Sequence, residues 1–403
     1  MDKEHIPFFN YDVLAILFRH VDYLTLRKCA QVCSLWKDVS VNEKKRRRNI
    51  YWVVKIRPDE HSITFEDPDA DEETNIRRRE LSCKVCSSGR KHHGSANPSL
   101  MEDELFNELK NIPMQPVFCM AFMTVSLFRK FPEYFPSFGS TVHKNKKQKF
   151  CEDVKKRKYF DQVKHTAVKD FLPENCPVAF AVASEIVGCY PNCKPVKSHR
   201  CFALSGIFIP EVTGVKISHF RMMKRNYNMS KFLAKNAPVK CILIFLPIVT
   251  EYPHELIQSC CVDNENIKMV VVGAFVEYTE CLLGSAVVFS GSNVEAASLQ
   301  FNILEKEEQI VAKFKTFQET GLLNHMCFAY VFGCFKRGLY FCRTVSRESE
   351  IFCKMYPNIP VIGIYTTGRL PYFEVKTGGF VKHESTYLPH ESSVFVLISL
   401  KIK

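Results

Sequence analysis

The sequence has no apolar run long enough to cross a membrane. Its strongest apolar runs, Cys241–Val249 and Met269–Val276, are far shorter than the roughly 20 residues that a membrane-spanning helix needs, and they are typical of buried strands. The first residues also lack the basic segment followed by an apolar segment that marks a secretory signal. We therefore expect a protein of the cytoplasm, the nucleus or both, with no membrane partner.

The sequence also lacks the common catalytic motifs. It contains no Gly-x-Ser-x-Gly, no phosphate-binding glycine loop and no His-Glu-x-x-His. Lys336 and Arg337 follow Cys334 closely and could make its thiol reactive, but a cysteine in an apolar strand is more often buried and inert. We predict no catalytic residue and no cofactor.

The formal charge of +12 is concentrated in short basic runs. These are Lys44–Arg48, Lys144–Lys149 and Lys155–Lys158. Such runs are typical of solvated faces or nuclear-import signals, and none has the interleaved aromatic residues of a single-strand-binding platform. A nucleic-acid partner is therefore not expected.

The 18 cysteines are expected to be free thiols, because nothing places the chain in an oxidising compartment. Two clusters have the composition of a zinc site, and neither has the spacing of a common zinc finger. They consist of Cys83, Cys86, His92 and His93, and of Cys189, Cys193, His199 and Cys201. In a cysteine-rich chain such clusters also arise by coincidence. We predict no metal and keep the second cluster as a candidate zinc site.

Alternating apolar runs and amphipathic segments predict an α+β body. Expected strands are Ile50–Ile56, Gln115–Val125, Pro177–Val187, Cys201–Ile209, Thr213–Phe220, Cys241–Val249, Met269–Tyr278, Cys327–Phe335, Val361–Tyr365 and Ser393–Leu400. Expected helices are Glu152–Phe171, Lys306–Thr320 and Glu348–Met355. Leu282–Ser290 and Glu295–Leu304 are predicted to form a hairpin about Gly291-Ser292-Asn293. No solenoid repeat is visible.

The first forty residues predict three short helices with surplus apolar surface. Val13, Leu14, Leu17, Phe18 and Val21 form one apolar stripe, and a second stripe follows Thr25, which can cap a helix. A third helix carries Leu35, Trp36 and Val39. Helices this short cannot enclose so much apolar surface by themselves, so part of it is expected to meet a partner.

This segment resembles the F-box family. The family runs Leu-Pro-x-Glu, an Ile-Phe pair, a Leu, an Asp-Leu pair and Val-Cys-x-x-Trp. Here Phe9-Asn10, Asp12, Leu17-Phe18, Val21 and Thr25-Leu26 take these positions, and Val32-Cys33-Ser34-Leu35-Trp36 closes the match. The resemblance implies binding to a Skp adaptor. The residues assigned to that contact are Phe9, Val13, Leu14, Leu17, Phe18, Val21, Val32 and Trp36.

The last third of the chain resembles the FIST C-terminal domain. The matching residues are Glu350, Phe352, Tyr356-Pro357, Pro360, Gly363, Tyr365 and Gly368, with Phe335–Gly338 in place of the family's Gly-Arg-Gly turn. FIST domains are proposed small-ligand sensors, so the resemblance implies a possible pocket. Its candidate residues are Arg337, Gly338, Gly363, Tyr365, Gly368 and Arg369. Arg369 stands where the family has an acid, which argues against inherited ligand binding.

Together these features predict a three-helix F-box followed by a mixed-sheet α/β FIST-like body in two parts. The expected domains are residues 1–49, 50–281 with a mobile insertion over 59–98, and 282–403. The implied function is non-catalytic: substrate recognition in a Skp–cullin–F-box ubiquitin ligase, with the Skp adaptor, a cullin, a RING subunit and a protein substrate as partners. The alternatives are a small-ligand-sensing module outside any ligase and a zinc-bearing nucleic-acid-binding protein.

Overall fold

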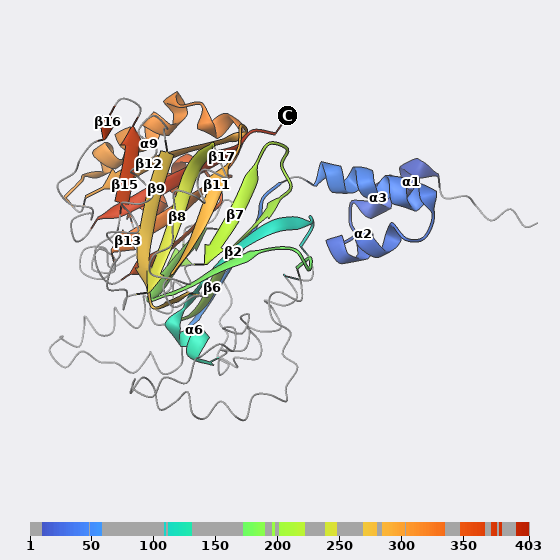
Figure 1. Ribbon diagram of the computed structural model, residues 1–403, viewed down its shortest axis with the longest axis horizontal. Coiled ribbons are helices and arrows are strands. Elements are labelled where there is room, and N and C mark those ends of the chain that lie inside the picture. The colour runs from blue at the N-terminus through green and yellow to red at the C-terminus, as the bar shows by residue number, and fades with distance from the viewer. Residues whose placement is uncertain are drawn as a thin grey trace, which may run out of the picture.

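The computed structural model describes residues 10–47, 49–58, 109, 112–130, 172–189, 196–197, 201–221, 238–247, 269–279, 284–302, 304–334, 347–366, 372–376, 379–380 and 392–402. The protein is α+β, as predicted: three N-terminal helices stand to one side of a larger body of mixed sheets (Figure 1). We call residues 10–47 the head and the described residues from Ile50 onward the body. The predicted helix Glu152–Phe171 and the predicted insertion 59–98 lie outside the described residues.

The body repeats one four-strand arrangement three times. The first unit is β1 (Tyr51–Pro58), β2 (Pro116–Thr124), β3 (Val178–Ala183) and β6 (Cys201–Pro210); the second is β7 (Lys216–Arg221), β8 (Val239–Pro247), β9 (Met269–Val276) and β11 (Ser285–Ser290); the third is β12 (Val294–Phe301), β13 (Met326–Cys334), β14 (Val361–Thr366) and β17 (Ser393–Leu400). In each unit the fourth strand lies between the first and the second, and the second and third strands are parallel. The architecture is therefore threefold although the sequence shows no repeat.

The three units are joined by exchanged strands. After its third strand, each unit sends a short segment to another unit's sheet, where it pairs antiparallel with that unit's third strand. These segments are β4 (Glu185–Cys189) on β14, β10 (Tyr278–Thr279) on β3 and β15 (Tyr372–Lys376) on β9. The short strands β5 (Val196–Lys197) and β16 (Gly379–Phe380) extend two edges. Sheets are thus shared across the expected boundary at residues 281 and 282, which does not separate two sheets.

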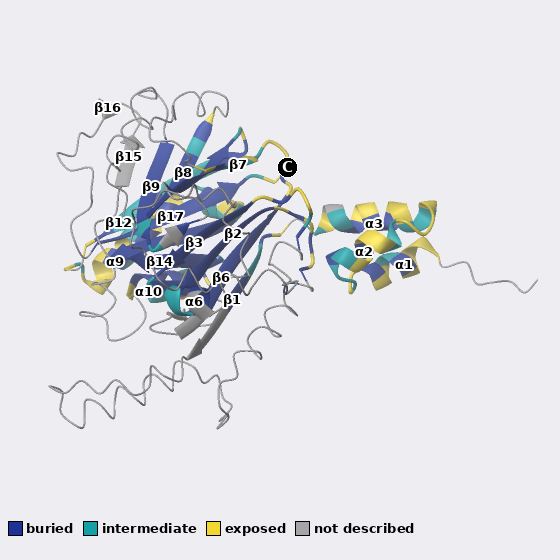
Figure 2. Ribbon diagram, turned by 60° about the horizontal axis from the view of Figure 1, so that its bottom comes forward, coloured by how far each residue is buried: buried dark blue, intermediate teal, exposed yellow. Residues whose placement is uncertain are grey.

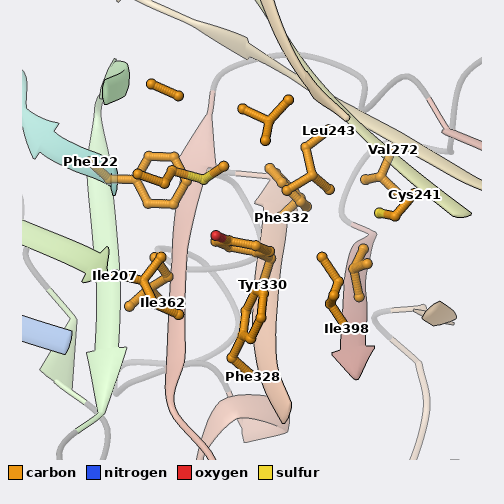
Figure 3. Close-up of a cluster of buried hydrophobic side chains, with 14 of the residues drawn as sticks. Phe122, Ile207, Cys241, Leu243, Val272, Phe328, Tyr330, Phe332, Ile362 and Ile398 are labelled. Atoms are coloured by element: carbon orange, nitrogen blue, oxygen red, sulfur yellow. The ribbon is translucent and has the colours of Figure 1, made fainter. Parts of the chain in front are cut away.

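Alternate residues of the strands fill one interior between the sheets (Figure 3). Phe122, Phe245 and Phe332 each lie two residues before the end of their unit's second strand, with ring centroids 5.7 Å apart for the first two and 6.0 Å apart for the last two. Tyr330 lies one layer deeper, beside Phe122 and Phe328. The interior is therefore closed by aromatic packing.

Two further cores cover the outer faces of the first and third sheets. The first contains Leu109, Ile112, Met114 and residues of α6 (Val125–Lys130), and it packs on β2 and β3. The second lies under α9 (Glu307–Glu319), the 3₁₀ turn Leu322–Asn324 and α10 (Arg347–Met355). α9 ends before Gly321, whose φ of 72° is the left-handed conformation that glycine accommodates well.

The predicted strands are confirmed where the structure describes them, except that three predicted connections are wrong. β11 and β12 do not form a hairpin: β11 pairs with β7 and β8, whereas β12 pairs with β17. The turn between them, with Gly291 at φ 117°, moves the chain from the second sheet to the third. Likewise two predicted strands each divide between two sheets. Pro177–Val187 divides at Ser184 into β3 and β4, and Met269–Tyr278 divides at Glu277 into β9 and β10.

The described cysteines are free, as expected, and none of those nine forms a disulfide. Burial raises the pKa of Cys176 to about 12 and that of Cys327 to about 11, so both thiols stay protonated at neutral pH. Among the described residues, no helix has the length and apolar character needed to cross a membrane.

Candidate docking surface on the helical head

The head consists of α1 (Tyr11–Phe18), α2 (Tyr23–Cys29) and α3 (Ser34–Arg46) around a small core. Leu14, Phe18, Leu26 and Val39 are each at most 3% exposed. Trp36 packs against them, with its ring 5.3 Å from that of Phe18 and nearly perpendicular to it. A fully buried set this small contributes little folding energy, so the head depends on good helix ends and on its attachment to the body.

Side chains cap the N-terminal ends of α1 and α2, whereas α3 begins after Cys33 without a side-chain cap. Asn10 caps α1, and Asp22 caps α2 by accepting the Thr25 amide at 2.9 Å. The prediction that Thr25 caps this helix is therefore wrong, because α2 begins one turn earlier and Thr25 is the donor. Burial alone would raise the pKa of Asp22, but hydrogen bonds from Thr25 and from nearby amides outweigh it and lower that pKa.

Many residues of the head are exposed, whereas most of the described strands are buried (Figure 2). Of the nine exposed large apolar side chains among the described residues, six belong to the head: Tyr11, Val13, Ile16, Leu17, Val32 and Val41. Val13, Ile16 and Leu17 share one face of α1 and are 46, 55 and 48% exposed, while Val32, in the turn before α3, is 62% exposed. This concentration marks the head as the candidate interaction surface.

The structure divides the residues predicted to contact an adaptor into three groups. Val13, Leu17 and Val32 are exposed and accessible to a partner. Val21 and Trp36 are half-buried against the head's core, and Leu14 and Phe18 lie inside it, so these last two stabilise the head and do not reach its surface. Phe9 lies outside the described residues.

Sequence reasoning missed Ile16. Its signal was available: Ile16 lies three residues after Val13 and one before Leu17, so the three residues share a face that Leu14 and Phe18 do not. Reading all five predicted residues as one stripe combined an inward and an outward face.

The predicted pocket residues fall on and after two parallel strands, β13 and β14, in which Cys334 is paired with Thr366. Of them, Arg337, Gly338, Gly368 and Arg369 come after the strands in sequence. Those four residues lie outside the described residues, and Cys334 is buried.

The two described pocket candidates are packing residues. Gly363 lies under Val331: an added Cβ would come within 2.2 Å of the Val331 carbonyl oxygen. The Tyr365 ring fills the space over Gly333 and is fully buried in the outer core of the third sheet. Their glycine and aromatic character therefore follows from close packing within the sheet.

Of the four side chains in the candidate zinc site, the structure describes only that of Cys189. Cys189 on β4 hydrogen-bonds to Cys353 on α10; this bond, together with burial, raises the pKa of Cys353. Cys193 and His199 lie outside the described residues, as do Cys83, Cys86, His92 and His93, and for Cys201 only the backbone is described. Among the residues that the structure describes, no three His, Cys, Asp or Glu side chains form a metal-ligand group.

Comparison with known proteins finds sequence similarity to F-box only protein 22. Over 253 residues the chain is 22% identical to F-box only protein 22 of Homo sapiens, and equally to that of Pongo abelii, covering 53% of this chain and 60% of each relative. The match thus spans about three-fifths of the relatives' length. It supports a distant relationship to an F-box protein. No protein-family profile matches the chain.

Structural similarity adds no functional argument. A cyanuric acid hydrolase from A. caulinodans aligns with 57% of this chain and 80% of its own at 8% identity, with a TM-score of 0.27. Such a score is too low to transfer a fold or a function.

Proposed function

We propose that this protein is a substrate-recognition subunit of a Skp–cullin–F-box ubiquitin ligase. The head binds the Skp adaptor, and the body recruits a protein substrate. The observation that carries the proposal is the exposed apolar face of α1, together with the exposed Val32 that opens the Val-Cys-x-x-Trp motif. The distant similarity to F-box only protein 22 supports the same class.

The proposed mechanism needs no catalytic group in this chain. An adaptor bound to the head and a substrate bound to the body are held near one another, which raises the effective concentration of the substrate at a charged ubiquitin carrier. The FIST assignment of the body and a location in cytoplasm and nucleus belong to the proposal as well.

The test is binding of the purified full chain to a Skp-family adaptor, followed by assembly with a cullin and a RING subunit. Leu17→Asp should abolish adaptor binding, because it places a charge in an apolar contact. Leu304→Asp is the matched control, since Leu304 is 88% exposed on the body. It should bind like the unaltered chain.

Two results would contradict the proposal at different levels. An unaltered chain that binds no Skp-family adaptor would exclude this function. Full binding by Leu17→Asp would leave the class intact but would show that the α1 face is not the docking surface. Thermal stabilisation of the full chain by free amino acids, without adaptor binding, would favour the ligand-sensing alternative.

A further inference from the structure

The head and the body meet at a largely buried arginine. Arg47 directly follows α3, and its side chain is 10% exposed. The guanidinium pairs with Glu43, one turn earlier, at 2.9 Å, and the Glu43 side chain is 6% exposed. A buried guanidinium needs acceptors for all its donors, so its remaining partners show what it holds together.

Those partners are three backbone carbonyls from two parts of the molecule. Two belong to the head: Nη1 donates to the Val21 carbonyl at 2.6 Å, and Nη2 donates to the Phe18 carbonyl at the end of α1. The third belongs to the body: Nη1 also donates to the Pro113 carbonyl at 2.6 Å. One planar group therefore bridges the end of α1, the end of α3 and the body.

The body side of this bridge is firmly anchored. Ile112 and Met114, on either side of Pro113, are each 2% exposed and belong to the outer core on the first sheet. A second bond runs beside the arginine, because the Tyr23 amide at the start of α2 donates to the Ile112 carbonyl at 3.2 Å. The Tyr23 amide is thus a reporter of contact between head and body.

We propose that Arg47 is a positioning residue that fixes the orientation of the head on the body. Without it, the connection through residues 47–50 and the Tyr23 bond would let the head reorient. In a ligase, this would fix the position of the adaptor relative to the substrate, a consequence that rests on the proposed function. The role of Arg47 at the junction does not rest on it.

Hydrogen exchange of single amides in the full chain tests this inference. Arg47→Ala should raise the exchange rate of the Tyr23 amide by roughly tenfold or more, because the head–body contact opens more often. The Ala30 amide, which donates to the Leu26 carbonyl inside the head, should exchange at its original rate. Arg47→Lys should give an intermediate rate at Tyr23, since an ammonium lacks the planar fork.

Two controls separate positioning from folding. Arg46→Ala removes the neighbouring arginine, which pairs with the same Glu43 at 3.1 Å but is 54% exposed, and it should leave both amides unchanged. Glu43→Gln combined with Arg47→Ala removes the lone buried carboxylate that Arg47→Ala would leave behind, and it should still raise exchange at Tyr23 alone.

The outcomes are distinct. Unchanged exchange at Tyr23 in Arg47→Ala would overturn the inference. Equal increases in the exchange rates of the Tyr23 and Ala30 amides, both in Arg47→Ala and in Glu43→Gln combined with Arg47→Ala, would also overturn it. Arg47 would then act in folding the head. Adaptor affinity should change by less than about twofold in Arg47→Ala. Failure of the unaltered chain to bind an adaptor would exclude the proposed function while the exchange result stood.

Discussion

The head and the body differ in how completely they bury their apolar side chains. The body directs its apolar side chains into a shared interior and two outer cores, and few large ones remain exposed on it. The head buries five large apolar side chains almost completely, those of Leu14, Phe18, Tyr23, Leu26 and Val39, and leaves six exposed. The more complete burial in the body fits a part that supplies stability, and the exposed apolar side chains of the head fit its proposed role in association.

The largest expected effect is in the body's interior. Phe245→Ala removes a ring that contacts both Phe122 and Phe332, and it should lower the unfolding free energy by about 3–5 kcal/mol because the closed interior cannot collapse around the cavity. Denaturant unfolding followed by circular dichroism measures this. A loss below about 1 kcal/mol would contradict the description of a sealed, aromatic-packed interior.

A pair of glycine substitutions tests how closely the sheets are packed. Gly363→Ala should cost about 1–3 kcal/mol or more, because the added methyl meets the Val331 carbonyl oxygen. Gly206→Ala is the matched control in β6, where the nearest atoms to an added Cβ are 3.6 Å away. It should change stability by less than about 1 kcal/mol. Thermal unfolding of both variants measures the two losses of stability. Equal losses would show that glycine is required for its backbone freedom and not for lack of space.

The strands themselves could be predicted from sequence because a fully buried strand needs a continuous apolar run, and runs such as Ser393–Leu400 are easily recognised. Their pairing could not be predicted. β10 has two residues and β4 follows β3 after a single residue, so the exchanged strands have no local signal, and their partners lie far away in sequence. The Gly291 turn looked like a hairpin because turn residues fix a local bend, not which sheet the next strand joins.

The candidate site was predictable to a similar extent. Apolar spacing predicted the head as a surface for a partner, which remains a proposal, but it could not separate inward from outward positions on α1 until the packing of α3 was known. Leu14 and Leu17 are both leucines in one stripe; Val39 and Trp36 of α3 pack in the same core as Leu14, and Leu17 stays exposed.

A pair of tyrosine substitutions compares two buried hydroxyls. The Tyr330 hydroxyl has no hydrogen-bond partner within the described structure, and burial raises the pKa of Tyr330. Tyr330→Phe should therefore raise the unfolding free energy by about 1 kcal/mol, since it removes an unpaired polar group. Tyr356→Phe should lower it by about 1 kcal/mol, because that hydroxyl donates to the Phe314 carbonyl at 2.9 Å. Denaturant midpoints of the two variants should shift in opposite directions; a loss in both would mean that Tyr330 has a partner.

The head's stability should depend on the Asp22 cap. Asp22→Ala should lower it by about 1 kcal/mol, and Asp22→Asn, which can still accept from the Thr25 amide, should lower it less. Because the pKa of Asp22 is lower in the folded head, its carboxylate stabilises the head above the unfolded pKa of about 3.9, and this contribution is lost as pH falls through the folded value. Exchange of the Ala30 amide against pH measures the effect, and Asp22→Asn should remove that part of the pH dependence. A pH profile identical in Asp22→Asn and the unaltered chain would contradict the role of the charge.

The most direct test of the comparison measures folding and binding on one substitution. Leu17→Ala, at an exposed position of α1, should change the unfolding free energy by less than about 0.5 kcal/mol. It should raise the dissociation constant for a Skp-family adaptor by about tenfold or more. Calorimetric titration and denaturant unfolding of the same preparation give both numbers. Unchanged affinity together with a loss of stability would contradict the account, because the exposed face of the head would then serve folding and not association.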